Sequence, residues 1–232
     1  MKEIEFLPKT MEAEMLVDPP GPARKSIPHW FASMPAFKGG KPKVDNNGEG
    51  NSTVKMCLPF ADSFGMGYIQ STWADMMVSQ EDDGGLTISL SSSDPVLMDM
   101  RPETSHKIPE DFYQQEFAWH SQWIPKVPKG YSVMYTHPLN REDLPFQTFS
   151  GIVDSDGYYH ETDANHPFLI KKGFTGLIPR GTPMFQMIPF KRDDWKSNVV
   201  AHDSDHYLRA TKVRQRFWGG YKEMFWHKKT FN

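Results

Sequence analysis

The densest cluster of side chains that could bind a metal lies near the end of the sequence. His202, Asp203, Asp205 and His206 fall within one run of five positions, and imidazole with carboxylate is the ligand set of non-haem iron sites. A looser group upstream comprises His160, Glu161, Asp163 and His166. We expect no cofactor from this spacing, but a divalent metal, and with it a cupin-like metal-dependent oxygenase, stays an alternative.

The run at residues 202–206 also has a purely structural interpretation. Iron ligands of the oxygenase type come from a strand and from a distant histidine, whereas these residues are contiguous and directly precede a helical pattern. An Asp203 or Ser204 side chain at a helix N-cap accepts a hydrogen bond from a free backbone N–H. This explanation of the carboxylates needs no metal.

A second group with possible chemistry is Gly-Ile-Val-Asp-Ser-Asp-Gly-Tyr at residues 151–158, followed by residues 168–172, Gly181 and Gln186. This pattern resembles the third motif of the trimeric dUTPases and their dCTP deaminase relatives, a β-clip family. The resemblance covers residues 150–190 and implies a β-clip-like C-terminal half. It also implies that Asp154 positions or activates water and that Tyr158 stacks beneath a deoxyribose. A dUTPase-like or deaminase-like nucleotide enzyme is therefore another alternative.

The sequence departs from that family at several positions. Gly157 is inserted before the tyrosine, Tyr159 and His160 stand where Arg-Gly is expected, and no Arg-Ser-Gly phosphate motif occurs. An aromatic helical pattern replaces the glycine-rich C-terminal phosphate clamp. The resemblance therefore indicates fold more than activity, and Asp154 is also an ordinary turn residue. A broader similarity to uncharacterised proteins of tailed-phage genomes carries no functional assignment.

Three further residues could do chemistry singly. His120, which lies between two tryptophans, and His137, at the end of a predicted strand, could be buried acid or base groups. A histidine packed beside aromatic rings is more often hydrogen-bonded and structural. Cys57 lies in the apolar run VKMCLPF, which predicts an inert core residue rather than a nucleophile.

Composition limits the classes of function. The 232 residues carry a net charge of −3 with acidic and basic residues interspersed, which argues against nucleic acid as the main partner. One cysteine cannot form an intramolecular disulfide, the first residues lack a secretory pattern, and no apolar run approaches the roughly 20 residues of a membrane helix. We expect a single-domain protein of the bacterial host cytoplasm or of a virion, without a membrane partner.

High proline and aromatic content predicts a mostly-β chain. The run at residues 150–192 predicts a β-meander with strands at 168–170, 174–178 and 184–190 and turns at Gly173 and Gly181. Further strands are expected at residues 54–60, 67–80, 84–91, 112–119, 122–125 and 131–137. About eight to ten strands predict a single-domain β-sandwich or barrel.

Both ends of the chain are expected to lie outside this β domain of residues 54–200. Residues 1–37 predict an extended, proline-rich arm with one aromatic helical turn, and residues 38–53 predict a flexible loop. Residues 201–232 predict a C-terminal helical tail that is weakened at Gly219 and Gly220.

Aromatic residues in the predicted tail either pack on their own domain or form an interface with another subunit. The interface residues would be Trp218, Tyr221, Phe225 and Trp226. The function predicted from the sequence is a non-enzymatic oligomeric assembly or binding protein. Its partners would be further copies of the chain or other protein subunits.

Overall fold

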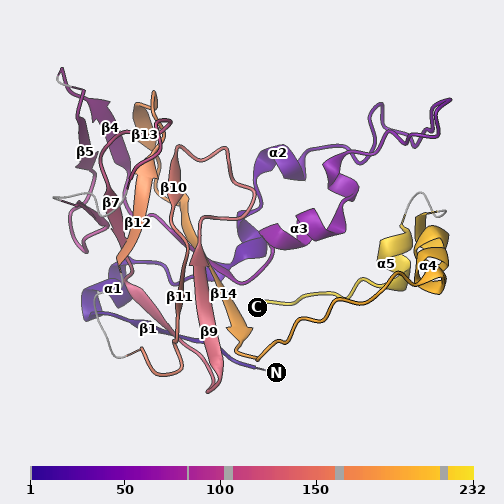
Figure 1. The fold of residues 1–232 in the computed structure, drawn as a ribbon. Helices are drawn as coiled ribbons and strands as arrows, with labels where there is room; N and C mark the ends of the chain where they lie inside the picture. Colours follow the sequence, from indigo (N-terminus) through magenta and orange to yellow (C-terminus); the bar gives the residue numbers. More distant parts are fainter. Residues whose placement is uncertain (1, 83, 102–106, 160–164, 215–218) are drawn as a thin grey trace.

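The computed structural model describes residues 2–82, 84–101, 107–159, 165–214 and 219–232. Strands make up 31% and helices 18% of the structure, which confirms the mostly-β prediction. The described strands form several antiparallel sheets, none of which closes on itself (Figure 1). No helix in the described ranges is long and apolar enough to cross a lipid bilayer.

The largest sheet has five strands in the order β11-β9-β14-β3-β2. Its strands are β11 (Gly151–Val153), β9 (Tyr131–Thr136), β14 (Pro183–Lys191), β3 (Tyr68–Ser71) and β2 (Gly21–Pro22). All neighbouring strands are antiparallel. Five consecutive residues of β14, 184–188, are buried, so both faces of this central strand are covered.

Three smaller sheets complete the β-rich part of the molecule. The four-stranded sheet has the order β10-β12-β7-β6, the three-stranded sheet β13-β4-β5, and the two-stranded sheet β1-β8. The strands are β10 (Phe146–Thr148), β12 (Asn165–Ile170), β7 (Phe117–His120), β6 (Met98–Met100), β13 (Gly176–Ile178), β4 (Met76–Gln80), β5 (Leu86–Leu90), β1 (Glu5–Pro8) and β8 (Trp123–Lys126).

The core lies between the four-stranded and five-stranded sheets. Trp119 of β7 stacks on Phe168 of β12 with ring centroids 3.7 Å apart, and the Phe146 ring of β10 contacts both. The Trp119 indole N–H donates to Thr148 Oγ1 at 3.1 Å. The Thr148 hydroxyl in turn donates to the Met184 carbonyl of β14 at 2.7 Å, so this buried chain of hydrogen bonds joins the two sheets.

The predicted β-meander is wrong in its pairing, although strands lie near all three expected places. β12 pairs with β10 and β7, β13 pairs with β4, and β14 pairs with β3 and β9. Local alternation indicates where strands form, but the covering of apolar faces decides which strands become neighbours. Because β14 is buried on both faces, it needs partners from distant parts of the chain.

Predicted strand bounds need other corrections upstream. The run 67–80 forms two strands, β3 and β4, separated by a corner at residues 72–75, and only the end of the run 112–119 belongs to β7. From residue 54 onward the described chain contains β3 to β14, which are more numerous than the eight to ten strands predicted. The hairpin of β4 and β5 lies at the expected position, with the Glu81 N–H donating to the Gly85 carbonyl at 2.9 Å.

Residues 54–60, predicted as a strand, belong to helical structure. A 3-10 turn, η2 (Val54–Met56), leads into α3 (Leu58–Phe64). Pro59 lies in the first turn of α3, where a missing N–H costs no helical hydrogen bond. Cys57 is exposed just before this helix, so its prediction as a core residue is wrong, because the helix buries Phe64 rather than the start of the run.

The N-terminal segment packs along the β-rich part. β1 pairs with β8, and α1 (Met11–Leu16) is capped by Thr10, whose Oγ1 accepts from the Ala13 N–H at 3.1 Å. Two short helices follow β2, η1 (Ala23–Ser26) and α2 (His29–Ala32). The Phe31 ring of α2 lies 4.7 Å from the Phe64 ring of α3. Residues 38–53 then extend away from α2 and α3 (Figure 1).

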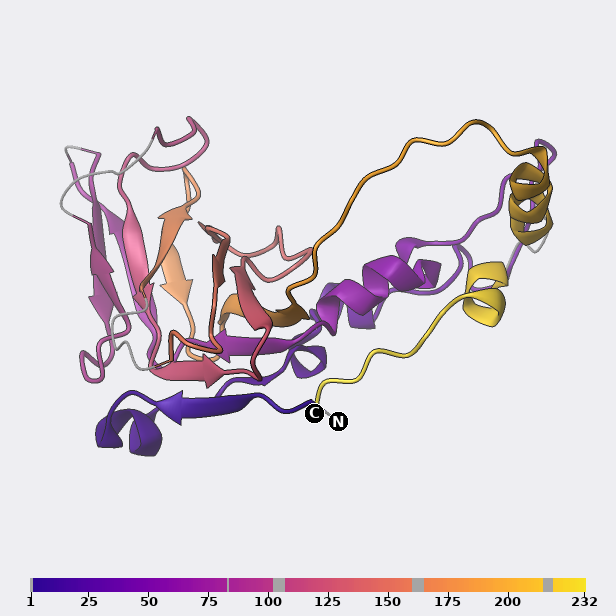
Figure 2. The same cartoon turned by 60° about the horizontal axis from the view of Figure 1, so that its bottom comes forward.

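The predicted C-terminal helix is present as two helices, α4 (Ser204–Arg214) and α5 (Gly220–Met224). Gly219 has a φ of 111° directly before α5, which is a conformation that glycine adopts without strain. Residues 193–203, which we call the strap, join β14 to α4 and run outward from the β sheets (Figure 2). The chain then returns, and the Asn232 carbonyl accepts from the Tyr68 hydroxyl at 3.3 Å.

Two glycines with positive φ differ in the space around them and give a matched test of this packing. A Cβ on Gly67 would lie 2.0 Å from the Met187 carbonyl oxygen, whereas a Cβ on Gly181 meets nothing within 4 Å. We expect Gly181→Ala to cost about 1 kcal/mol of unfolding free energy from backbone strain alone. Gly67→Ala should cost roughly 2–5 kcal/mol because overpacking adds to the strain.

Urea unfolding of the two glycine variants measures this difference. Equal losses of stability would contradict the close approach of β3 and β14 at Gly67.

Candidate binding site

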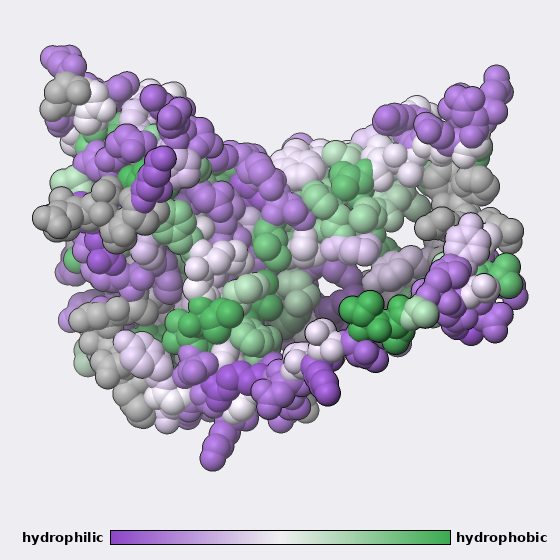
Figure 3. Space-filling model, viewed as in Figure 1, coloured by the Kyte–Doolittle hydropathy of each residue, from purple (hydrophilic) through white to green (hydrophobic). Residues whose placement is uncertain are grey.

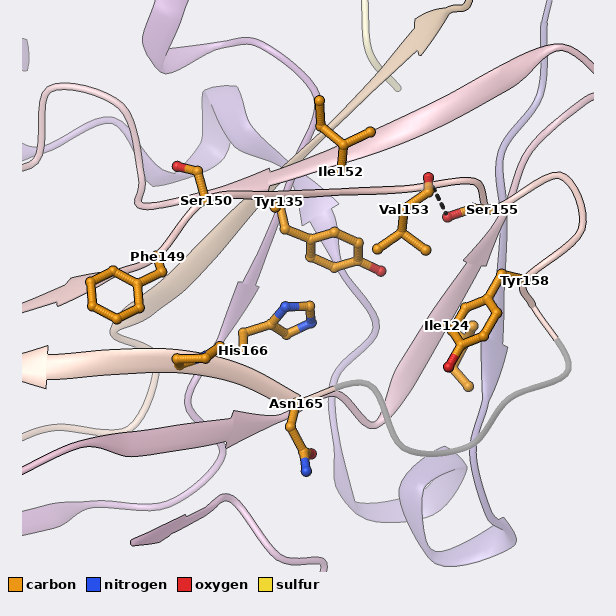
Figure 4. A pocket seen from close by; sticks show the side chains of 12 residues that line it. Ile124, Tyr135, Phe149, Ser150, Ile152, Val153, Ser155, Tyr158, Asn165 and His166 are labelled. Carbon is orange, nitrogen blue, oxygen red and sulfur yellow. Dashed lines mark hydrogen bonds between the residues drawn. The ribbon is translucent and has the colours of Figure 1, made fainter. Parts of the chain in front are cut away.

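A cavity of about 370 Å³ lies where β11 and β9 of the five-stranded sheet face the start of β12 (Figure 4). We call it the His166 pocket. It is lined by Ile124, Tyr135, Phe149, Ser150, Gly151, Ile152, Val153, Ser155, Tyr158, Asn165, His166 and Pro167. Its size lies at the lower end of the range for small-ligand pockets, about 300–1,000 Å³. None of these lining residues is acidic or is a lysine or arginine.

The inner wall of the pocket is a stack of aromatic rings. The His166 imidazole lies 4.2 Å from the Tyr135 ring, nearly parallel to it, and 4.5 Å from the Phe185 ring. Burial lowers the pKa of His166 to about 3 and raises the pKa of the Tyr135 phenol. Both side chains are therefore uncharged at neutral pH, and the pocket favours uncharged groups.

Two polar atoms at this wall lack a hydrogen-bond partner. His166 Nε2 and Asn165 Oδ1 are buried, and no described residue donates to them or accepts from them. Most buried polar atoms in folded proteins have a partner, and leaving one unsatisfied costs about 1–3 kcal/mol. In Figure 4 the His166 ring lies next to the Tyr135 ring on one side of the cavity, opposite Tyr158. A hydrogen-bond donor bound in the pocket would supply the missing partner of the imidazole.

The outer side of the pocket is formed by the turn after β11. The Gly157 and Tyr158 N–H groups donate to the Asp154 carbonyl at 3.0 and 2.9 Å, so the backbone reverses there. The turn places the Tyr158 ring beside Ile124 of β8 at the edge of the cavity (Figure 4). Tyr158, which the sequence singled out, therefore lines the pocket.

Asp154 belongs to a separate ionic cluster that does not line the pocket. Its carboxylate accepts from the Ser132 hydroxyl at 2.6 Å and lies 2.9 Å from the Arg192 guanidinium. The Ser132 hydrogen bond and Arg192 hold the pKa of Asp154 below its usual range. Arg192 also pairs with Asp156, whose carboxylate accepts from the Gly130 N–H at 2.8 Å. A carboxylate with a lowered pKa is a weak general base.

Gln186, another residue of the dUTPase-like pattern, makes hydrogen bonds within the fold. Gln186 is buried in β14, where its side-chain oxygen accepts from the Leu139 N–H at 2.9 Å and its amide nitrogen donates to the Ser63 carbonyl at 3.1 Å. It thereby holds the loop after β9 against the end of α3. His160, Glu161 and Asp163 lie outside the described residues.

His120 and His137 both have hydrogen-bond partners. His120 Nε2 lies 3.0 Å from Asp99. His137 accepts from the Thr148 N–H through Nδ1 at 3.3 Å, and its Nε2 lies 3.1 Å from the Arg141 carbonyl. Burial lowers the pKa of His137. These contacts fit the structural interpretation of the two histidines.

The histidine and aspartate side chains of residues 202–206 do not point toward one common metal position. Asp203 Oδ1 accepts from the Asp205 N–H at 2.9 Å and so caps α4, which is the structural alternative considered from the sequence. The His202 ring faces Tyr207 at 6.4 Å between centroids. His206 lies within α4. Within the described ranges, no three histidine, cysteine, aspartate or glutamate side chains form a group that could hold a metal ion.

Of the aromatic residues predicted to form an interface, one contacts its own chain and two are exposed to solvent. The Trp226 indole N–H donates to the Asp62 carboxylate of α3 at 2.8 Å, so this side chain contacts its own chain. Tyr221 and Phe225 are exposed on and beside α5. Trp218 lies outside the described residues.

Sequence reasoning missed Tyr135 and Asn165 as pocket residues, and it missed Trp195 of the strap as an exposed aromatic. The first two lie on different sheets and line one pocket only because these sheets pack together, which leaves no local signal. The exposure of Trp195 did have a local signal, because this tryptophan lies between charged residues and is not part of a helical or strand-like apolar pattern. The chain matches no protein-family model, and a search of curated proteins gives no match either.

His166 predicts a specific acid sensitivity. The folded protein keeps this imidazole neutral down to a pKa of about 3, whereas in the unfolded chain it has the ordinary value of about 6.5. Its stabilising effect is therefore present above pH 6.5 and is lost as the pH falls toward 3, by at most about 1.4 kcal/mol per pH unit. His166→Phe should remove this part of the pH dependence.

The measurement is the unfolding free energy from urea titrations between neutral and mildly acidic pH. His29→Gln, at an exposed position on α2, is the control and should follow the wild-type curve. A His166→Phe curve parallel to that of the wild type would contradict the neutral, buried state of His166.

Proposed function

We propose that the protein is a non-enzymatic, oligomeric assembly protein whose strap and C-terminal helices bind a neighbouring subunit. The two larger sheets, which share one core, would serve as a scaffold of the open β-sandwich type. The exposed apolar residues of the strap are the observation that carries this proposal.

The strap exposes apolar side chains to an extent unusual for a folded segment. Trp195 is 91% exposed and Val199 97%, and Val200 is exposed as well. Tyr207 and Leu208 continue the exposed apolar surface onto α4. Figure 3 shows hydrophobic residues on the thin connection between the β-rich part and the C-terminal helices. Apolar surface of this type marks protein interfaces.

The backbone of the strap is equally unpartnered. No described residue accepts a hydrogen bond from its N–H groups, which contrasts with β14 directly before it. An extended segment with free backbone groups is the form that adds as a strand to another sheet. Burial of one large apolar side chain contributes about 1.5–3 kcal/mol, so contact with a second subunit would stabilise a conformation that has little support within its own chain.

The His166 pocket favours binding over catalysis. Asp154, the residue that would activate water in a dUTPase-like enzyme, is paired with Arg192 and does not line the pocket. The described pocket lining offers no cation for a triphosphate. No feature of the pocket specifically supports the dUTPase-like or deaminase-like enzyme or the cupin-like oxygenase.

Self-association should depend on the strap valines. Val199→Asp with Val200→Asp places two charges where the proposal expects buried methyl groups, and should weaken self-association by roughly a hundredfold or more. The melting temperature of the subunit should stay the same, because both side chains are exposed. Sedimentation velocity over a range of concentrations measures the effect.

Met11→Asp with Met15→Asp is the matched control, since both methionines are exposed on α1, away from the strap. A wild-type protein that stays monomeric at every concentration would refute the proposed assembly.

A further inference from the structure

We infer that the His166 pocket is the receptor for Trp195 of a second copy of the chain. The inference rests on the proposed assembly and names the contact that would hold it together. It joins two incomplete features of one molecule: an exposed indole without a hydrogen-bond acceptor and an aromatic pocket with an unpartnered imidazole nitrogen.

Trp195 differs from every other tryptophan that the structure describes. The other five donate the indole N–H to an acceptor within the chain. These are Trp30, Trp73, Trp119, Trp123 and Trp226. Trp195 has no such acceptor among the described residues and is 91% exposed. A large apolar ring with one free donor is the kind of group that anchors an interface by entering a pocket.

The pocket fits this ring in size, charge and hydrogen bonding. Its volume of about 370 Å³ and its lining of aromatic and aliphatic side chains suit one uncharged bicyclic group. His166 Nε2 is a buried ring nitrogen without a partner among the described residues, and it can accept a hydrogen bond when the ring carries its proton on Nδ1. An indole N–H donated to Nε2 would satisfy both atoms at once.

The valines of the strap lack this complementarity. Val199 and Val200 are also exposed, at 97% and 77%, but neither has a polar side-chain atom to pair with the imidazole. Trp195 is therefore the strap residue whose chemistry matches the pocket.

The free edge of β11 gives the strap a place to lie beside the pocket. Among the described strands β11 has β9 as its one neighbour, and Ile152 of this edge strand lines the pocket and is exposed. No residue in the described ranges accepts a hydrogen bond from the N–H groups of the extended strap. Strand addition at this edge would pair them and would place an alternate side chain over the cavity.

A second copy is the occupant that the path of the strap indicates. Within one chain the strap leaves β14 at Arg192 and runs away from the sheets toward α4 (Figure 2), so its own Trp195 lies in solvent. Two chains that exchange straps in this way form a closed, two-fold symmetric pair, because each supplies one tryptophan and one pocket.

Single substitutions test each half of the contact by sedimentation velocity. Trp195→Ala should raise the dissociation constant of self-association roughly 30-fold or more, as for an anchor residue. Trp195→Phe keeps a ring without the donor and should give a smaller loss. Ile152→Lys introduces a charge at the pocket rim and should match the alanine variant.

Leu177→Lys is the matched control for the pocket variant. Leu177 lies on the edge strand β13 and is 52% exposed, compared with 64% for Ile152. It should associate like the wild type. At a protein concentration where every chain is monomeric, the melting temperatures of all these variants should equal that of the wild type, because every substituted side chain is exposed.

Mixing the two disrupted chains tests whether the contact is made between copies. Trp195→Ala retains an intact pocket and Ile152→Lys retains the tryptophan, so the mixture should form a mixed pair that neither variant forms alone. A mixture that stays monomeric would overturn the exchange between copies.

Failure of this inference and failure of the proposed assembly give different results. If the wild type associates and Trp195→Ala or Ile152→Lys leaves the dissociation constant unchanged, the receptor pocket is wrong and the assembly stands. If the wild type does not associate at all, both are wrong.

Discussion

A buried hydrogen bond from Thr148 to the Met184 carbonyl joins the two larger sheets, and the stack of Trp119 on Phe168 lies within the four-stranded one. The rings lie 3.7 Å apart, and the hydrogen bonds from Trp119 through Thr148 to the Met184 carbonyl leave little freedom for one sheet to slide over the other. β12 begins with Asn165 and His166 and continues into this core at Phe168. The His166 pocket therefore lies at the start of a strand whose later residues belong to the shared core.

Arg192 connects the rim of that pocket to the start of the strap. The Arg192 guanidinium pairs with Asp154 and Asp156 on the turn that carries Tyr158. The backbone N–H of Arg192 donates to the Gly130 carbonyl at 2.9 Å. The same residue ends the contacts of β14 with the sheet. These contacts hold the turn at the edge of the pocket beside the residue from which the strap departs.

The sequence predicted what local pattern controls. β9 and the β4-β5 hairpin lie close to the positions expected from alternation and turn residues, and the Asp203 cap of α4 was one of two interpretations considered. The neighbours of each strand were not predictable, since β14 pairs with segments more than 45 residues earlier in the chain. Tyr135 of β9 and His166 of β12 meet through the packing of two different sheets, so the pocket has no signature in the sequence.

The strap can be exposed in the single chain because its apolar residues are separated by polar ones. Asp194 and Lys196 flank Trp195, and Ser197 and Asn198 precede the two valines. These polar neighbours keep the strap in contact with water in the free chain, while each large apolar side chain can enter a separate recess of a partner. A continuous apolar helix would bind many surfaces. Isolated anchors bind only where a pocket of the right shape and polarity meets each one, and this gives the strap its specificity.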